Sequence, residues 1–337
     1  MASWQAEVVK RLLVAGVKAQ RMRVLGDGGV LTAEASEDDL ERYALKLREQ
    51  LERVANITPL PNWASFESAD AHVPGEWVVS ERSEDQRVIL HLHGGGYFMG
   101  SPRTHRGLGA ALARTARARV FLPDYRLAPE HRFPAALEDA VHAYRWLLDE
   151  AGADPEGIAV SGDSAGGGLA VSLLLEIKRE ELPMPACYVG MSPWTDLAGT
   201  GDSVVARNHR DPWLEGSMIQ TAGRGYAGDT PLDHPGVSPL YGDFTGLPPM
   251  LVHVGTDEVL YDDGRRLVER AREAGVQADF GPWDGMWHVF HAFPGVPESK
   301  WALREIGAFI RRHTGHAHGP TGEGPRAADV DGHHHAA

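Results

Sequence analysis

The segment "GIAVSGDSAGGGLAVSLLLEIKRE" at residues 157–180 joins a short apolar run to a turn of small residues and then to an apolar helical pattern. The turn, "GDSAG" at 162–166, is a G-x-S-x-G sequence. Between a strand and a helix, this motif forms a sharp bend that raises Ser164 at the carboxyl edge of a sheet. A side chain at Gly162 or Gly166 would collide with the adjoining strand or helix. Because apolar runs flank the turn closely on both sides, we interpret it as a nucleophile elbow and not as a flexible linker.

The rest of the chain alternates short apolar runs with longer helical patterns. Strands that alternate with helices favour a mostly parallel sheet that is covered by helices on both faces, which is the α/β class. The expected strands are residues 76–82, 87–94, 118–125, 157–162, 186–192, 249–257 and 277–283, and the expected helices are residues 104–117, 134–151, 165–180, 261–274 and 298–313.

Three regions depart from this alternation. The N-terminal region, about the first 55 residues, carries two helical patterns, and Ser36 followed by three acidic residues is a typical start for the second helix. The stretch 195–245 is rich in Gly, Asp, Pro and His, and we expect an excursion above the sheet. The tail after Arg312 has almost nothing to bury, so we expect disorder there and treat its "HHH" at 333–335 as part of that tail.

Composition excludes several functions and locations. The net charge of −14, from 33 basic and 47 acidic residues, disfavours nucleic acids and anionic membranes as partners. The single cysteine, Cys187, permits no internal disulfide and no cysteine-based metal site. The N-terminus lacks the layout of a signal peptide, and no apolar run approaches the roughly 20 residues of a membrane span. These features predict a cytoplasmic protein without a membrane span.

A second glycine-rich motif, "LHLHGGGYFMG" at 90–100, also follows a predicted strand. Glycines leave backbone N–H groups uncovered, so Gly94 and Gly95 are candidate donors to an oxyanion, together with the N–H of Ala165. We expect His93 to brace this loop through hydrogen bonds. A phosphate-binding loop is the alternative, but the motif lacks the G-x-x-x-x-G-K-[ST] form.

A serine nucleophile needs a base, and the base needs an orienting group. Asp257 lies at the carboxyl tip of a predicted strand, and His288 lies in a loop after the next strand. The chain order Ser164, Asp257, His288 is the order of a triad in a fold with such an elbow. Four nearby residues receive other interpretations: Glu258, Asp262 and Asp263 as solvated or helix-start charges, and His291 as a packing residue.

Six motifs together resemble the hormone-sensitive-lipase family of α/β hydrolases, in its bacterial esterase branch. They span about residues 75–310 in the expected order: "HGGGYFMG", "DYRLAPEHRFPAALEDA", "GDSAGGG", "SPWTDL", "GTDEVLYDDG" and "GMWHVF". The resemblance implies a serine carboxylesterase that uses no cofactor and no metal. It places the triad on Ser164, Asp257 and His288 and the oxyanion donors on Gly94, Gly95 and Ala165. One departure is Val289, where family members often carry glycine, and we expect a local change of shape there.

The resemblance also implies a domain organisation. Residues 1–60 and an insertion at about 195–235 would form a helical cap over a catalytic domain at 61–313, with a disordered tail at 314–337. The family often forms homodimers through its last strand and helix, so a homodimer is compatible with the resemblance.

A cap suggests a confined apolar pocket, which favours short-chain esters or lactones as the small-molecule substrates. Four aromatic residues are candidate pocket residues: Tyr97, Phe98, Trp213 and Trp287.

Two other functions remain open at this point. The same triad could hydrolyse an amide or N-acetyl group, which requires firmer protonation of the leaving nitrogen. The fold also hosts non-catalytic ligand receptors, and fold alone does not establish chemistry. A complete set of Ser164, Asp257 and His288 favours the enzyme, because a receptor has no need of all three.

Overall fold

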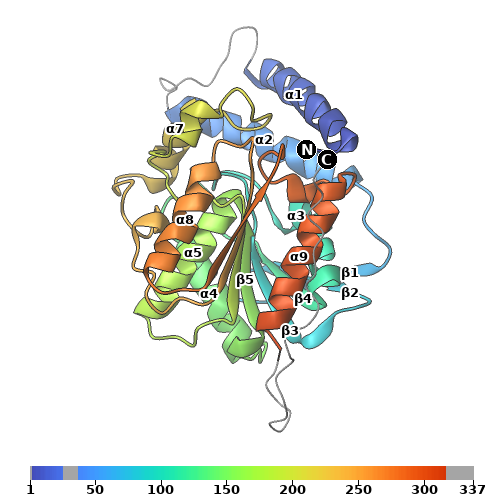
Figure 1. The fold of residues 1–337 in the computed structure, drawn as a ribbon, viewed down its shortest axis with the longest axis vertical. Coiled ribbons are helices and arrows are strands. Elements are labelled where there is room, and N and C mark those ends of the chain that lie inside the picture. The colour runs from blue at the N-terminus through green and yellow to red at the C-terminus, as the bar shows by residue number, and fades with distance from the viewer. Residues whose placement is uncertain (1, 26–36, 316–337) are drawn as a thin grey trace, which may run out of the picture.

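The computed structural model describes residues 2–25 and 37–315. Within them, an eight-stranded twisted sheet runs through the centre of the molecule, with helices on both faces (Figure 1). The order of the strands in the sheet is β1-β2-β4-β3-β5-β6-β7-β8. Their bounds are β1 Ala64–Ala69, β2 Gly75–Ser80, β3 Glu84–Leu92, β4 Ala118–Pro123, β5 Ile158–Asp163, β6 Cys187–Met191, β7 Met250–Gly255 and β8 Ala278–Trp283.

The sheet is parallel from β4 to β8, and β2 pairs antiparallel with both β1 and β4. The predicted α/β class with a mostly parallel sheet is confirmed. The prediction missed β1, whose sequence "ASFESA" is mostly small or polar and whose residues are half-buried or exposed. An edge strand of this kind carries no apolar run that periodicity could detect. β5, which leads into the elbow, lies at the centre of the sheet.

Two apolar clusters cover the two faces of the sheet. Along β5, Ile158 and Val160 point into one cluster, whereas Ala159 points into the other, as the period of two in a strand requires. Helices α4 (Ala135–Asp149), α5 (Ser164–Arg179) and α8 (Tyr261–Glu273) contribute to the first cluster.

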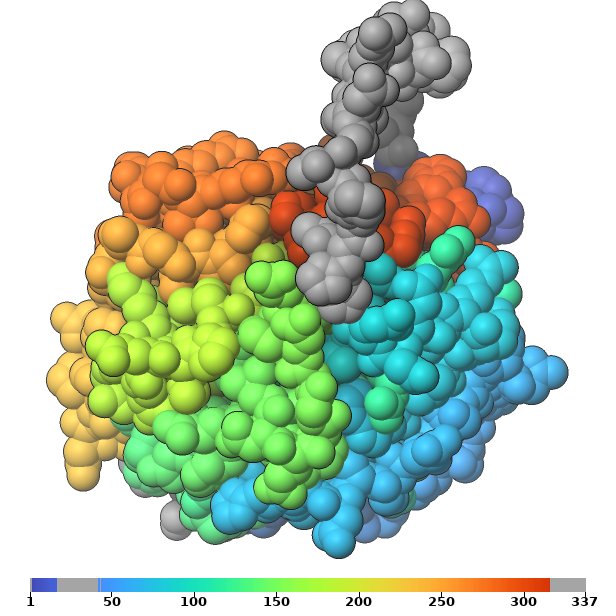
Figure 2. Space-filling model, turned by 90° about the horizontal axis from the view of Figure 1, so that it is seen from below, coloured from blue at the N-terminus to red at the C-terminus, as the bar shows by residue number. Residues whose placement is uncertain are grey.

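The second cluster includes α3 (Pro102–Ala116) and α9 (Pro297–His313), which pack side by side (Figure 1). Seen from below, the end of α9 (red) lies beside the cyan segment near residue 85 (Figure 2). Arg87 Nε donates to Thr314 Oγ1 across this contact at 2.7 Å.

Helices α1 (Trp4–Leu25) and α2 (Glu37–Ile57) lie over the carboxyl edge of the sheet, together with α7 (Gly216–Ala227) (Figure 1). The guanidinium of Arg48 fastens α2 by donating to the carbonyl oxygens of Phe98 and Ala128 and by pairing with Glu130 at 2.7 Å. Four shorter elements complete the described chain: α6 Ser203–Ala206, η1 Pro155–Gly157, η2 Pro239–Tyr241 and η3 Phe290–Ala292.

Some expectations lie outside the described residues. The cap residue Ser36 and the tail from residue 316 onward, including "HHH", are among them. The division into a cap at 1–60 and 195–235 and a catalytic domain at 61–313 stays a prediction. Among the described helices, none combines the length and the apolar character that a membrane crossing needs.

Candidate active site

The elbow follows from the backbone at the end of β5. Ser164 adopts a left-handed conformation with φ of 52°, which L-residues rarely take and which often marks functional positions. A Cβ at Gly162 would lie 2.2 Å from the carbonyl oxygen of Gly166, and one at Gly166 would lie 2.0 Å from that of Leu92. These distances confirm the expected collision, so both glycines are required for the bend that lifts Ser164 out of the strand.

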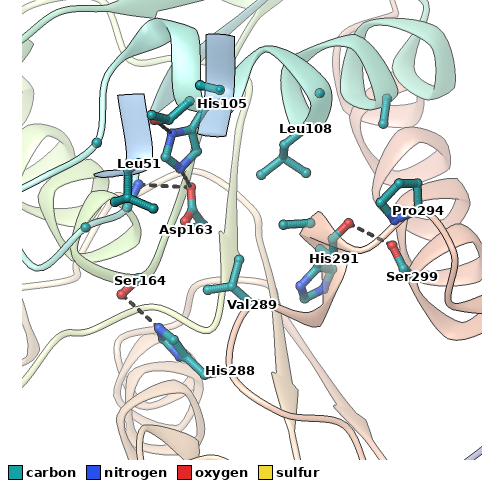
Figure 3. Close-up of a pocket in the computed structure, with 18 of the residues that line it drawn as sticks. Leu51, His105, Leu108, Asp163, Ser164, His288, Val289, His291, Pro294 and Ser299 are labelled. Atoms are coloured by element: carbon teal, nitrogen blue, oxygen red, sulfur yellow. Dashed lines mark hydrogen bonds and ion pairs between the residues drawn. The ribbon is translucent and has the colours of Figure 1, made fainter. Parts of the chain in front are cut away.

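The structure brings Ser164 and His288 together. Ser164 Oγ lies 2.9 Å from His288 Nε2, which is a normal hydrogen-bond distance (Figure 3). His288 comes from the loop between β8 and η3, 124 residues further along the chain, and it is 5% exposed. The predicted nucleophile and the predicted base therefore meet at the carboxyl edge of the sheet.

The carboxylate of Asp257 is engaged elsewhere. Its Oδ2 lies 2.5 Å from Lys10 Nζ on α1, and its Oδ1 lies 3.7 Å from Arg210. The imidazole of His288 faces the next residue instead, because Glu258 Oε1 lies 3.9 Å from His288 Nδ1. These two atoms are buried, and neither has a hydrogen-bond partner among the described residues. A shift of about 1 Å would join them in one hydrogen bond.

Glu258 is held firmly in this position. Its Oε2 accepts hydrogen bonds from Ser192 Oγ at 2.7 Å and from the N–H of Gly255 at 2.9 Å. The N–H of Val289 donates to the same Ser192 Oγ at 3.0 Å, which ties the carboxylate to the loop of His288. The interpretation of Glu258 as a solvated charge is wrong, because its side chain is fully buried. Asp262 and Asp263 lie in the first turn of α8, so their interpretation as helix-start charges is confirmed, although both are buried.

Val289 keeps the backbone shape that a glycine would give. Its φ is 50°, a left-handed conformation in which a β-branched side chain is strained. The local change of shape that we expected stays a prediction, and the structure shows a left-handed turn in which valine is strained. The hydrogen bond from the Val289 N–H to Ser192 supports this turn beside His288.

Two opposing effects act on the pKa of His288. Burial lowers it, but the Glu258 carboxylate that faces Nδ1, with smaller contributions from Asp211 and Asp163, outweighs the burial. The pKa of His288 is therefore raised above 6.5. A nearby carboxylate that stabilises the imidazolium is what a base needs when it accepts a proton from a serine.

The Asp163 carboxylate holds the glycine loop in place through a hydrogen bond and two histidine contacts. Its Oδ1 accepts the N–H of Gly94 at 3.1 Å and lies 3.2 Å from His91 Nε2 and 3.5 Å from His105 Nε2. Burial raises the pKa of Asp163, but the two histidines, His105 foremost, hold it well below its usual value. The Asp163 carboxylate thus accepts the Gly94 N–H, which we expected to donate to the oxyanion. A Cβ at Gly94 would lie 2.2 Å from Asp163 Oδ2, which explains the glycine at this position.

Gly95, Gly96 and Ala165 remain as backbone donors. Their N–H groups have no hydrogen-bond partner among the residues that the structure describes. Gly95 and Gly96 line the cleft above Ser164, and Ala165 lies in the first turn of α5, where backbone N–H groups are free. Sequence reasoning missed Gly96, although the third glycine of "HGGG" was a signal for it.

His93 supports the loop as expected. Its Nδ1 lies 2.9 Å from the carbonyl oxygen of Gly94, and its ring stacks on Tyr125 with centroids 4.2 Å apart. The Tyr125 hydroxyl donates to the carbonyl oxygen of His93 at 2.6 Å. Burial, followed by the charge of His105, lowers the pKa of His93 to about 3, so its imidazole is neutral and acts as a brace.

A cleft of about 1400 Å³ opens above Ser164. Phe98 and Trp213 line it, as expected. Tyr97 and Trp287 do not, because both are core residues: Tyr97 is 1% exposed and stacks on Tyr226 with centroids 3.7 Å apart, and Trp287 is fully buried. An aromatic residue beside a motif gives no sign in the sequence of the direction in which its side chain points.

His291 reaches the same cleft from the loop after His288. Its ring packs against His253 with centroids 5.6 Å apart, so the predicted packing role is confirmed. Burial, followed by the charge of His253, lowers the pKa of His291 well below 6.5, which keeps it neutral.

Comparison with known proteins places this geometry in a family. Residues 89–292 match the model of a family with the α/β-hydrolase fold. An acetyl-hydrolase of Streptomyces hygroscopicus is 45% identical over 245 residues, which cover 72% of this chain and 81% of the relative. An esterase of Acinetobacter venetianus is 40% identical over 242 residues, which cover 71% of this chain and 79% of the relative.

Solved structures agree with these relatives. An esterase from the bacterial hormone-sensitive lipase family superposes with a TM-score of 0.82 at 40% identity, covering 94% of this chain and all of that one. An esterase/lipase from an uncultured bacterium superposes with a TM-score of 0.82 at 38% sequence identity, covering 93% of this chain and 99% of that one. The predicted family and the predicted class of enzyme, a carboxylic ester hydrolase, are confirmed. The chain belongs to the α/β-hydrolase family, in its bacterial hormone-sensitive-lipase branch.

Proposed function

We propose that this protein is a serine esterase in which Ser164 is the nucleophile, His288 the base and Glu258 the orienting acid. The observation that supports it most is the 2.9 Å contact between Ser164 Oγ and His288 Nε2 at the tip of a strained elbow. The esterases among the relatives and solved structures support the class of reaction.

Acylation begins when the Ser164 hydroxyl donates its proton to His288 Nε2 and Oγ attacks the ester carbonyl carbon. The charge of Glu258 stabilises the imidazolium that forms. The C–O bond to the alcohol then breaks, and the proton on Nε2 passes to the leaving oxygen. Water next attacks the acyl-enzyme with His288 again as base, which releases the carboxylic acid and restores the Ser164 hydroxyl.

The tetrahedral intermediate carries its negative charge on the former carbonyl oxygen. In our proposal the N–H groups of Gly95, Gly96 and Ala165 stabilise it, while the Gly94 N–H keeps the loop in place through Asp163. Removing one oxyanion donor typically raises the barrier by about 3 kcal/mol. Fixed backbone donors are effective here because they need no reorganisation as the charge develops.

We propose that the acyl part of the substrate is a short chain, either in a linear ester or in a lactone. Apolar residues of the 194–222 region line the cleft on one side of Ser164, among them Trp194, Leu214 and Ile219. The side chain of Trp194 is buried, and the backbone N–H of this residue donates to the Ser164 carbonyl oxygen at 2.8 Å, so this wall is fixed close to the nucleophile. The acetyl-hydrolase of Streptomyces hygroscopicus supports a small acyl group.

Labelling with a fluorophosphonate probe tests the reaction type. The probe phosphonylates a serine only when a base activates it, so we expect stoichiometric labelling of Ser164, identified by peptide mass spectrometry. Prior heat denaturation should abolish the labelling and serves as the control. A folded protein that hydrolyses no ester and takes up no probe would point to a ligand receptor instead.

The pH dependence of hydrolysis reports the state of His288. Only the neutral imidazole can accept the serine proton, so kcat/KM should fall as the pH drops through the pKa of His288. Because Glu258 raises that pKa, the inflection is expected above 6.5. The measurement is kcat/KM for a non-ionising ester across the pH range. A plateau that continues unchanged to pH values below 6.5 would show that Glu258 does not act on the base.

A further inference from the structure

The cleft extends well beyond the nucleophile. Figure 3 shows Ser164 and His288 on one side of Val289, and Leu108, His291 and Pro294 on the other. All of these residues line one continuous cavity. The cavity therefore has a second arm, which begins at the loop after His288 and continues along the outside of α3.

One wall of this second arm is a stripe along α3. Thr104, Gly107, Leu108, Ala111 and Thr115 line it, and their spacing of three and four residues places them on one face of the helix. From the first to the last of them the helix rises by about 16 Å. A Cβ built on Gly107 meets no atom within 4 Å, so the arm is open at this point.

The adjoining wall is a stripe along α9, which packs directly against α3, so the arm is a groove over the seam of the two helices. Leu303 is buried at its middle, and the basic residues Lys300, Arg304 and Arg311 line it on the same face of the helix. Apolar side chains of α2 form a third wall: Leu47, Leu51, Val54 and Ala55. The arm is thus apolar over its length and basic along the α9 side.

Among the described residues, this basic stripe has no carboxylate at ion-pair distance, although the charge of Glu84 acts on Arg311. Four other cleft arginines, at positions 82, 103, 114 and 117, have a carboxylate oxygen within 3.2 to 3.8 Å. Lys300, Arg304 and Arg311 have no ion-pair partner among the described residues. The Arg311 guanidinium donates to the Thr115 carbonyl oxygen, and burial together with repulsion from neighbouring arginines lowers its pKa. In a chain with a net charge of −14, two cationic side chains without an ion pair, Lys300 and Arg304, are a local exception at the start of this stripe.

The direction of the ester in the cleft follows from the proposed reaction. The leaving oxygen must take its proton from His288 Nε2, so the alcohol lies on the side of His288. The residues after His288, from Val289 to Pro294, line the beginning of the second arm. The alcohol part of the substrate therefore enters the second arm, and the short acyl part lies toward Trp194.

We propose that the second arm binds the alcohol part of the substrate, and that this alcohol is a long apolar chain that ends in an anionic group. The chain packs along Leu108 and Ala111 over the seam of α3 and α9, and the anion pairs with Lys300 and Arg304, which lie one helical turn apart. This inference rests on the proposed esterase function and specifies its substrate class: short-acyl esters of anionic amphiphilic alcohols. A terminal carboxylate and a terminal phosphate share this chemistry.

The test compares three acetate esters of equal chain length below their critical micelle concentrations. One ends in a carboxylate (the acetate of ω-hydroxyhexadecanoic acid), one in a methyl group, and one in a trimethylammonium group. Acetate release gives kcat/KM, expressed relative to p-nitrophenyl acetate for each enzyme variant. We expect the wild type to favour the carboxylate ester over the trimethylammonium ester by about tenfold or more, because charge-assisted pairs outweigh neutral contacts. A matched ester with a terminal phosphate distinguishes the two anions.

Two variants locate the preference in the second arm. The double variant Lys300→Ala/Arg304→Ala should lose the preference for the anionic end, whereas Arg312→Ala, which removes a charge from the same helix outside the cleft, should retain it. Gly107→Leu places a side chain into the open arm and should lower the relative kcat/KM of all three long esters more than Gly107→Ala does.

The outcomes separate the two proposals. Equal use of anionic and cationic esters by the wild type, or a preference that survives Lys300→Ala/Arg304→Ala, overturns the anionic alcohol. If the wild type does not hydrolyse p-nitrophenyl acetate at all, the esterase function itself has failed. If Gly107→Leu does not fold, Lys300→Ala/Arg304→Ala and Arg312→Ala still test the proposal, because these three residues are exposed on α9 and their removal should not prevent folding.

Discussion

Replacing Ser164 by alanine is expected to abolish the hydrolysis of p-nitrophenyl butyrate, with a loss of kcat on the order of 10⁴-fold or more. The substitution removes the only atom that forms the acyl-enzyme in the proposed mechanism. Alanine also lacks the hydroxyl that lies 2.9 Å from His288 Nε2, so the base has no proton to accept. The residual rate should reflect binding and the oxyanion donors alone.

Ser172→Ala provides the matched control for this experiment. Ser172 is a buried serine on the same helix, and its hydroxyl donates to the Gly236 carbonyl oxygen at 3.2 Å, away from the cleft. Its removal should cost about 1 kcal/mol of stability and leave kcat/KM near that of the wild type. Circular dichroism should show that both variants are folded. Turnover by Ser164→Ala at the rate of the control would refute Ser164 as the nucleophile.

The elbow and the sheet could be predicted because their signals are local. At Gly162 and Gly166 the backbone itself leaves no room for a Cβ, so the residue types record the geometry directly. The buried strands carry apolar runs for the same reason. The edge strand β1 carries no such run, since all of its residues are half-buried or exposed, and its residues show no periodicity from which to predict it.

The details in which our proposed site differs from the sequence prediction depend on contacts between distant parts of the chain. Asp257 and Glu258 are neighbours of the same charge, and only the position of Lys10 on α1 shows which one points outward. Gly94 and Gly96 are identical residues, and only the Asp163 carboxylate shows which N–H is already occupied. Each choice was set by a partner more than 60 residues away, which no local pattern contains.

The choice between the two acids can be decided by a pair of substitutions that remove one charge each. Glu258→Gln is expected to lower kcat by about 10³- to 10⁴-fold, because an amide there donates to His288 Nδ1 and leaves the proton on Nε2. In that tautomer the imidazole cannot accept the serine proton. The shape of the side chain is kept, and an amide oxygen can still accept the hydrogen bonds from Ser192 and Gly255.

Asp257→Asn makes the opposite prediction. It weakens the contact with Lys10 on α1, a partly buried ion pair that does not face His288, so the expected change in kcat is less than about threefold. Steady-state kinetics with p-nitrophenyl butyrate on both variants, at a pH above the inflection of the wild type, gives the answer. A large loss in Asp257→Asn with a small one in Glu258→Gln would restore the triad that the sequence order suggested. The reverse result establishes that Glu258, the buried carboxylate facing the imidazole, and not Asp257, its neighbour in the chain, orients the base.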